Sequence, residues 1–193
     1  MAEKRIYPFT RREFIQTGAA LTAGLMIPSY AYADGSETIR IGLIGCGGRG
    51  TGAAGDSLRG NTDVQLVAMG DLQPDRLERS KKSLSELATR YPEVAGKFKV
   101  TDDMCFTGFD AYKKVLATDV DLVILATPPG FRPLHLAAAV DAGKHIFAEK
   151  PVATDIAGIH SVLATYEKAN QKKLGIGVGT QRRHDAGYIE VIK

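Results

Sequence analysis

Short strand-like segments alternate with helix-like segments from residue 38 onward. Strand-like composition occurs at Ile39–Ile44, Val64–Met69, Lys97–Val100, Val120–Ala126, His145–Ala148 and Leu174–Val178. Helical spacing or helix-favouring composition occurs between them, at Thr51–Leu58, Pro74–Arg90, Phe109–Ala117, Pro133–Ala142 and Thr154–Asn170. Thr154 is the expected N-cap of the last of these helices. Such alternation is typical of right-handed crossovers between parallel strands, with helices on both faces. The pattern therefore predicts an α/β fold with a doubly wound parallel sheet.

Residues 1–33 have a different pattern, which is typical of an export signal. The Arg11-Arg12 pair precedes a short apolar stretch, Ala19–Pro28, and the small-residue site Ala31-Tyr32-Ala33. This layout matches a signal peptide, and the apolar stretch is too short to span a bilayer. Paired arginines resemble the signal read by the twin-arginine export machinery. We expect cleavage after Ala33 and a periplasmic protein, the alternative being an amphipathic helix that happens to begin with two arginines.

The composition is that of an ordinary globular protein. The 193 residues include 25 Lys and Arg against 22 Asp and Glu, and 44% are hydrophobic. Disordered polyampholytes, collagen-like repeats and multi-span membrane proteins are thereby excluded. With 7% aromatic residues and no Trp, the chain lacks a stacking platform, so we expect no nucleic-acid partner. Cys46 and Cys105 fit neither a disulfide framework nor a zinc motif, and no metal site is expected.

A glycine-rich turn, Gly45-Cys46-Gly47-Gly48-Arg49-Gly50, follows the first predicted strand and opens the first predicted helix. In this context Gly45 permits a tight turn, Gly47 lets a pyrophosphate approach the backbone, and Gly50 lets helix and strand pack closely. The free amides and dipole of the helix N-terminus favour phosphate charge. The motif predicts a Rossmann-like dinucleotide site that includes Gly48 and Arg49, although a ligand-free tight connection has the same pattern.

Asp71 follows the second predicted strand, 21 residues beyond Gly50. An acidic residue at this spacing usually accepts hydrogen bonds from the ribose hydroxyls of the adenosine half. Its charge repels a 2′-phosphate, so we expect NAD as the cofactor. NADP stays possible because Arg76 lies in the same region, and Asp71 can alternatively serve as a helix N-cap before Pro74.

Two further motifs end the fourth and fifth predicted strands. Ala126-Thr127-Pro128-Pro129 ends one strand, and Glu149-Lys150-Pro151 ends the next. Ligands bind at the carboxyl ends of strands in open α/β sheets. A lysine placed there can polarise and orient a substrate hydroxyl for hydride removal, so Lys150 is the candidate catalytic residue. A solvated loop lysine is the alternative.

Together these motifs resemble the Gfo/Idh/MocA family, named after glucose–fructose oxidoreductase, inositol dehydrogenase and a rhizopine-catabolism oxidoreductase. The matching segments are Ile41–Gly50, Asp71, Ala126–Pro129, Gly143–Ala153 and Gly177–Arg182. The resemblance implies that Lys150 takes part in substrate binding and catalysis and that Glu149 helps to place the cofactor. It also implies a set of further cofactor-binding residues, namely Thr127, Pro128, Pro129, His135, Gln181 and Arg182.

The resemblance further implies an NAD(P)-dependent oxidoreductase acting on a sugar or polyol, and a homo-oligomer for the full-length parent. We expect a Rossmann domain over residues 38–178 and only the start of a second α/β domain over residues 179–193. A chain truncated there is expected to bind dinucleotide without turning over substrate. Two alternatives stay open: an NAD-dependent glycoside hydrolase of related fold, and a non-catalytic dinucleotide-binding fragment.

Overall fold

The computed structural model describes residues 38–180, 183 and 185–192. The export signal expected over residues 1–33 lies outside the described residues, and so do the candidate cofactor residues Gln181 and Arg182. Those expectations stay predictions.

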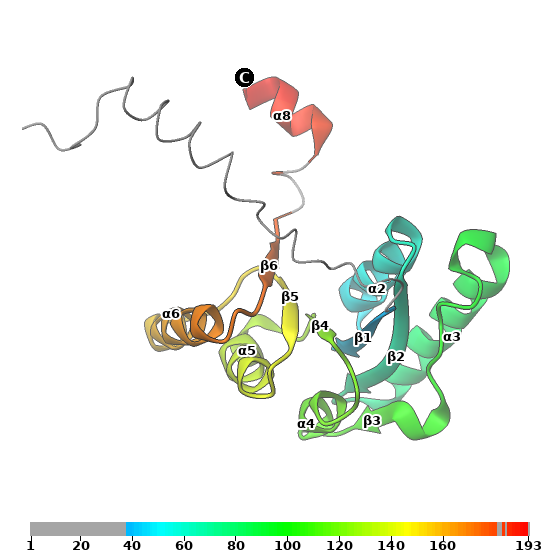
Figure 1. Cartoon of the computed structure of the whole chain (residues 1–193), viewed down its shortest axis with the longest axis horizontal. Coiled ribbons are helices and arrows are strands. Elements are labelled where there is room, and N and C mark those ends of the chain that lie inside the picture. Colours follow the sequence, from blue (N-terminus) through cyan, green and yellow to red (C-terminus); the bar gives the residue numbers. More distant parts are fainter. Residues whose placement is uncertain (1–37, 181–182, 184, 193) are drawn as a thin grey trace, which may run out of the picture. The chain divides into compact units, whose positions relative to one another are not determined.

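One sheet of six parallel strands forms the centre of the fold, in the order β3-β2-β1-β4-β5-β6 (Figure 1). The strands are β1 (Ile39–Ile44), β2 (Val64–Asp71), β3 (Cys105–Thr107), β4 (Leu122–Leu125), β5 (His145–Glu149) and β6 (Ile176–Gly179). The strand order reverses between β1 and β4, where a doubly wound sheet opens a crevice for a ligand. The predicted doubly wound parallel sheet is confirmed.

Helices cover both faces of this sheet (Figure 1). One face carries α2 (Gly48–Gly60) and α3 (Pro74–Arg90), and the other carries α4 (Ala111–Leu116), α5 (Arg132–Asp141) and α6 (Ile156–Gln171). Short 3₁₀ turns lie at η1 (Pro92–Val94), η2 (Asp102–Met104) and η3 (Pro129–Phe131), and α8 (Ala186–Ile192) follows β6. Within the described part of the chain, none of the helices is both long enough and apolar enough to cross a membrane.

Alternation along β1 builds two hydrophobic cores, one on each face. Leu43 is fully buried in the cluster that includes Leu58 and Leu84 of α2 and α3. Its neighbour Ile44 faces the opposite cluster, with Leu136 of α5. Successive strand residues point to opposite faces, so a central strand that is apolar on both faces must be sandwiched between helices. The packing of helices on both faces holds β1 and β4 side by side. The loops that follow these two strands form the crevice.

Two local predictions are wrong. Residues 97–100 form no strand, because Phe98 makes only an isolated bridge to Leu66, and the third strand is Cys105–Thr107. An edge strand of three residues buries too little apolar surface to leave a readable pattern. The N-cap of α6 is Asp155 rather than Thr154, since the Asp155 carboxylate accepts a hydrogen bond from Gly158 N at 2.6 Å.

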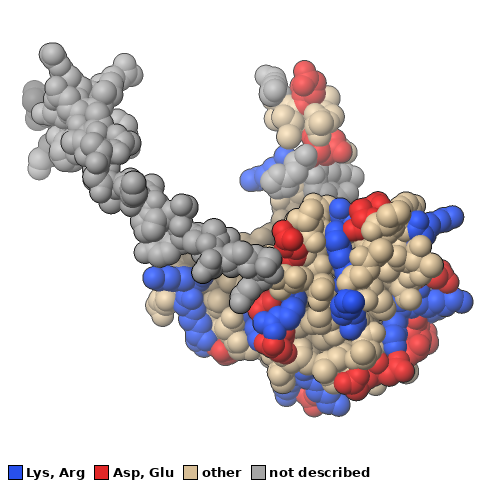
Figure 2. Space-filling model, turned by 45° about the vertical axis from the view of Figure 1, so that its right-hand side comes forward, with Lys and Arg blue, Asp and Glu red and all other residues tan. Residues whose placement is uncertain are grey.

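Basic and acidic side chains are interspersed on the face shown in Figure 2. This mixture agrees with the near balance of 25 basic and 22 acidic residues in the sequence. Several charged side chains of the described residues are paired, as Arg79 is with Asp75 at 2.7 Å. Exposed pairs of this kind contribute little to stability.

Substitution of two glycines in α2 should affect stability in opposite directions. A Cβ at Gly50 would lie 1.9 Å from the carbonyl oxygen of Gly45, so Gly50→Ala should cost about 1–3 kcal/mol or more. A Cβ at Gly52 would meet no atom within 4 Å, so Gly52→Ala should stabilise the fold by up to about 1 kcal/mol through helix propensity. Urea unfolding measures both, and similar effects from the two substitutions would contradict this packing.

Candidate functional site

A cavity of about 520 Å³ lies where the strand order reverses, between the carboxyl ends of β1 and β4. Eleven of the candidate residues line it, coming from both halves of the sheet: Gly45, Gly47, Gly48, Arg49, Asp71, Thr127, Pro128, Pro129, His135, Glu149 and Lys150. The structure therefore brings together residues that are more than 100 positions apart in the sequence.

The glycine-rich turn presents bare backbone to this cavity. Gly45 has a φ of +99°, which a side chain would strain, and Gly47 is the extended N-cap of α2. A Cβ at Gly47 or Gly48 would meet no atom within 4 Å. Gly50 does not line the cavity but packs against Gly45, as the sequence led us to expect. The open turn and the helix N-terminus fit a pyrophosphate, because unpaired amides there favour negative charge.

Asp71 is the last residue of β2 and connects it to the glycine-rich turn. Its Oδ2 accepts a hydrogen bond from Cys46 N at 2.6 Å, and its Oδ1 accepts one from Gln73 N at 2.9 Å. The N-cap position of α3 belongs to Gln73. A carboxylate offers about four acceptor sites, so roughly two stay available for ribose hydroxyls. Asp71 thus holds the turn and can hold a ligand as well.

Cys46 contributes its backbone to the site rather than its thiol. The side chain is 3% exposed, and burial, with the nearby charge of Asp71, raises the pKa of the thiol. A neutral buried thiol is a small apolar group and a poor nucleophile. The Cys46 side chain therefore acts as a packing group beneath the turn.

An aromatic stack forms the wall of the cavity beside β4. The ring of His135 lies 4.3 Å from that of Tyr112 and 5.9 Å from that of Phe131. Nδ1 of His135 is 3.1 Å from the hydroxyl of Thr127. Burial, with the positive charge of Arg132, lowers the pKa of His135 to about 4, so the imidazole is neutral at pH 7. His135 serves there as a stacking and hydrogen-bonding group.

Arg132 is a buried part of the site that the sequence did not indicate. Its guanidinium is 2% exposed and donates hydrogen bonds to the carbonyl oxygens of Leu125 and Thr127, the latter at 2.6 Å. These bonds hold the end of β4 and the turn that follows. An arginine at a helix start reads as a surface residue in sequence, and no local pattern distinguishes it.

The end of β5 places a buried carboxylate beside an exposed lysine. Glu149 is 4% exposed, and its Oε1 lies 2.6 Å from Nη2 of Arg49 in the first turn of α2. Lys150 follows directly, is exposed, and lines the cavity. The predicted Glu-Lys-Pro motif thus supplies one enclosed anion and one cation that is accessible to a ligand.

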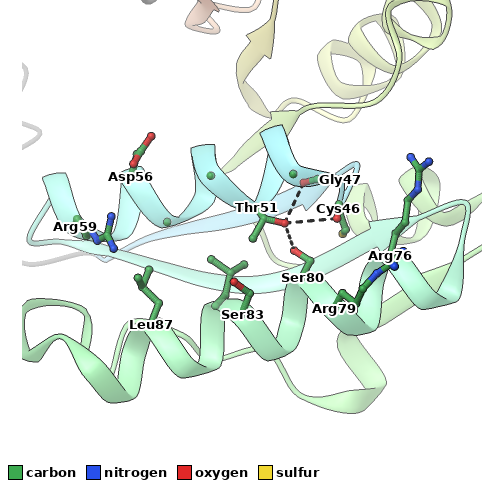
Figure 3. Close-up of a pocket in the computed structure, with 14 residues that line it drawn as sticks. Cys46, Gly47, Thr51, Asp56, Arg59, Arg76, Arg79, Ser80, Ser83 and Leu87 are labelled. Atoms are coloured by element: carbon green, nitrogen blue, oxygen red, sulfur yellow. Dashed lines mark hydrogen bonds between the residues drawn. The ribbon is translucent and has the colours of Figure 1, made fainter.

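A second cavity, of about 780 Å³, lies between α2 and α3 (Figure 3). In it the Thr51 hydroxyl forms hydrogen bonds with Gly47 O at 3.0 Å and with Ser80 Oγ at 2.7 Å (Figure 3). The second bond joins the two helices directly behind the glycine-rich turn. Thr51 therefore ties the turn to α3, a role that the sequence did not indicate.

Residues 39–178 match the Gfo/Idh/MocA family model, described as an oxidoreductase family with an NAD-binding Rossmann fold. The chain belongs to this family. Its Rossmann fold is accordingly of the NAD-binding type, and the glycine-rich turn, the open helix N-terminus and Asp71 fit a nicotinamide dinucleotide.

Relatives of this Gfo/Idh/MocA chain include two enzyme types. Inositol 2-dehydrogenase 3 of Saccharopolyspora erythraea is 32% identical over 154 residues, which are 80% of this chain and 39% of that protein. A glycosyl hydrolase family 109 protein of the same organism is 26% identical over 189 residues, covering 88% of this chain and 39% of that protein. The chain therefore spans about two fifths of the length of these curated relatives.

A solved structure shows the same fold. Scyllo-inositol dehydrogenase from Lactobacillus casei, with bound NAD(H) and scyllo-inositol, superposes with a TM-score of 0.61 at 29% identity. The match covers 80% of this chain and 39% of that one.

Asp71→Asn should shift cofactor preference toward NADP. Asparagine keeps an acceptor oxygen for Cys46 N, while the charge that repels a 2′-phosphate is lost. We expect the affinity for NADP⁺ relative to NAD⁺ to rise roughly tenfold. Calorimetric titration with each dinucleotide measures this ratio, and Asp75→Asn, on the exposed first turn of α3, is the matched control. An unchanged ratio in Asp71→Asn would contradict the ribose assignment.

His135 should make stability depend on pH below 6.5. As the pH falls from about 6.5 toward 4, the unfolded chain gains a proton on His135 that the folded chain resists, so the fold loses stability. His135→Gln removes this contribution, and the stability difference between parent and variant should shrink across that window. Denaturant unfolding at several pH values tests this, with the exposed His160→Gln as control. If the difference in free energy of unfolding between the parent and His135→Gln stays constant across this pH range, His135 is not the source of the pH dependence.

Proposed function

We propose that this chain is the dinucleotide-binding part of an NAD-dependent oxidoreductase that acts on a sugar or polyol, with Lys150 as its catalytic residue. The supporting observation is the continuity of one cavity from Asp71, past the glycine-rich turn, to Lys150. This path crosses the point where the strand order reverses, as a dinucleotide does in a doubly wound sheet.

Each part of the cavity has a separate task in this proposal. Asp71 accepts hydrogen bonds from the adenosine ribose, and the first turn of α2 donates backbone N–H groups to the pyrophosphate. The nicotinamide end then falls beside β4 and β5, next to Lys150. When bound, NAD⁺ supplies the hydride acceptor.

Lys150 acts on the substrate oxygen. Its Nζ donates a hydrogen bond to the hydroxyl of the carbon that loses hydride, and so orients that carbon. The ammonium charge also stabilises the negative charge that develops on the oxygen as its proton passes to solvent water. The exposure of Lys150 at the cavity leaves Nζ accessible to a substrate.

An inositol or related cyclic polyol is the substrate class that we favour. The inositol dehydrogenase relatives, at up to 32% identity, support this choice. The glycosyl hydrolase family 109 relatives support a second candidate, an NAD-dependent glycoside hydrolase. In that reaction the same hydride acceptor is used transiently, so reduced cofactor does not accumulate.

Two measurements test the proposal. Titration of the purified chain with NAD⁺ tests dinucleotide binding. In the complete protein, a polyol panel with NAD⁺ should yield NADH, whereas release of the aryl group from aryl glycosides without net NADH would favour the hydrolase. A chain that binds no dinucleotide would refute both candidates.

Lys150→Met should lower the rate of NADH formation by about 10²–10³, the usual contribution of a donor that stabilises developing negative charge. The affinity for NAD⁺ should change much less, because Asp71 and the turn supply most of the cofactor contacts. Lys114→Met, at an exposed position on α4, is the matched control and should retain parental turnover. Full turnover in Lys150→Met would overturn the catalytic assignment.

A further inference from the structure

One ion pair spans the crevice at the point where the strand order reverses. Nη2 of Arg49 lies 2.6 Å from Oε1 of Glu149, so the first turn of α2 is joined to the end of β5. The Arg49 side chain is 47% exposed, whereas that of Glu149 is 5% exposed. A pair with one buried member is screened less by solvent than a surface pair, so its charges act on neighbouring groups.

Glu149 is held tightly in this position. A Cβ added at Gly179 would come within 2.8 Å of Oε2, so β6 closes over the carboxylate. The charge of Glu149 also acts on the buried Arg132, whose Nη atoms are already bonded to the carbonyl oxygens of Leu125 and Thr127. Among the described residues, Arg49 is therefore the cation that forms an ion pair with Glu149.

The Glu149 end of the pair lies in the half of the cavity assigned to nicotinamide, and Arg49 reaches it from the first turn of α2. Asp71 ends β2 in the adenosine half, and in the other half Glu149 ends β5 and Lys150 follows it. Arg49 and Glu149 both line the cavity. A net charge left there by either partner would act on the ring of a bound cofactor.

We propose that the Arg49–Glu149 pair sets the relative affinity of the site for oxidised and reduced dinucleotide. The oxidised nicotinamide ring carries a positive charge and the reduced ring carries none, while the rest of the two molecules is the same. An uncompensated carboxylate attracts the oxidised ring, and an uncompensated guanidinium repels it. With both partners present their two charges offset each other, so the pair adds no net charge beside the ring. This inference rests on the proposed dinucleotide function.

The test compares the dissociation constants of NAD⁺ and NADH for the purified chain, by calorimetry and by NADH fluorescence. Arg49→Met should lower the ratio of the NAD⁺ constant to the NADH constant roughly tenfold, because Glu149 loses its partner. Glu149→Gln should raise the same ratio roughly tenfold, because Arg49 is left alone. The double variant should return close to the parental ratio.

If the two single variants shift the ratio of dissociation constants in opposite directions and the double variant restores it, the effect comes from charge and not from altered packing. A purely structural disturbance would weaken both forms together and leave the ratio unchanged. Arg49→Lys is the matched control, since it keeps the charge and should hold the ratio within about twofold of the parent. Arg49 is half exposed, so Arg49→Met and Arg49→Lys decide the question even if Glu149→Gln does not fold.

Failure of this inference is separable from failure of the proposed function. If the parent chain binds neither NAD⁺ nor NADH, the proposed function is wrong. If the parent binds both and Arg49→Met changes the two constants equally, the function stands and the role of the ion pair is overturned.

Discussion

The approach of Gly50 to the carbonyl oxygen of Gly45 is the constraint on which the site depends. A Cβ at Gly50 would lie 1.9 Å from that oxygen, so only glycine lets α2 begin this close to β1. The turn between them uses a positive φ at Gly45. With α2 this close to β1, the backbone N–H of Cys46 donates a hydrogen bond to Asp71. Arg49 then forms its ion pair with Glu149. One contact between backbones thus positions groups in both halves of the cavity.

Buried charges then give the site its fixed geometry. Two backbone N–H groups hold Asp71, Arg49 holds Glu149, and two carbonyl oxygens hold Arg132. A buried charge is costly unless it has a partner, so each of these groups has few alternative positions. A preorganised cavity of this kind suits a dinucleotide, because little ordering is left for the moment of binding.

Much of the fold could be predicted because its signals are local. Central strands such as β4 are nearly all apolar, and α3 combines helical spacing with Pro74 at its start. The edge strand Cys105–Thr107 could not be found, since its three residues are partly buried or exposed and carry no polar–apolar alternation. Asp71 could be proposed from the strand that precedes it and its spacing from the glycines, and Lys150 from the strand that precedes it and the Glu-Lys-Pro resemblance.

By itself the sequence determined the doubly wound architecture, the dinucleotide turn and the residues at the strand ends, because these depend on periodicity and on glycines at fixed spacing. Only the tertiary structure decided which of them meet. It buried Arg132 beneath the turn after β4, stacked His135 between Tyr112 and Phe131, and paired Arg49 with Glu149. The reason is physical: burial and charge pairing depend on which crossovers the sheet brings together, and no local pattern carries that information.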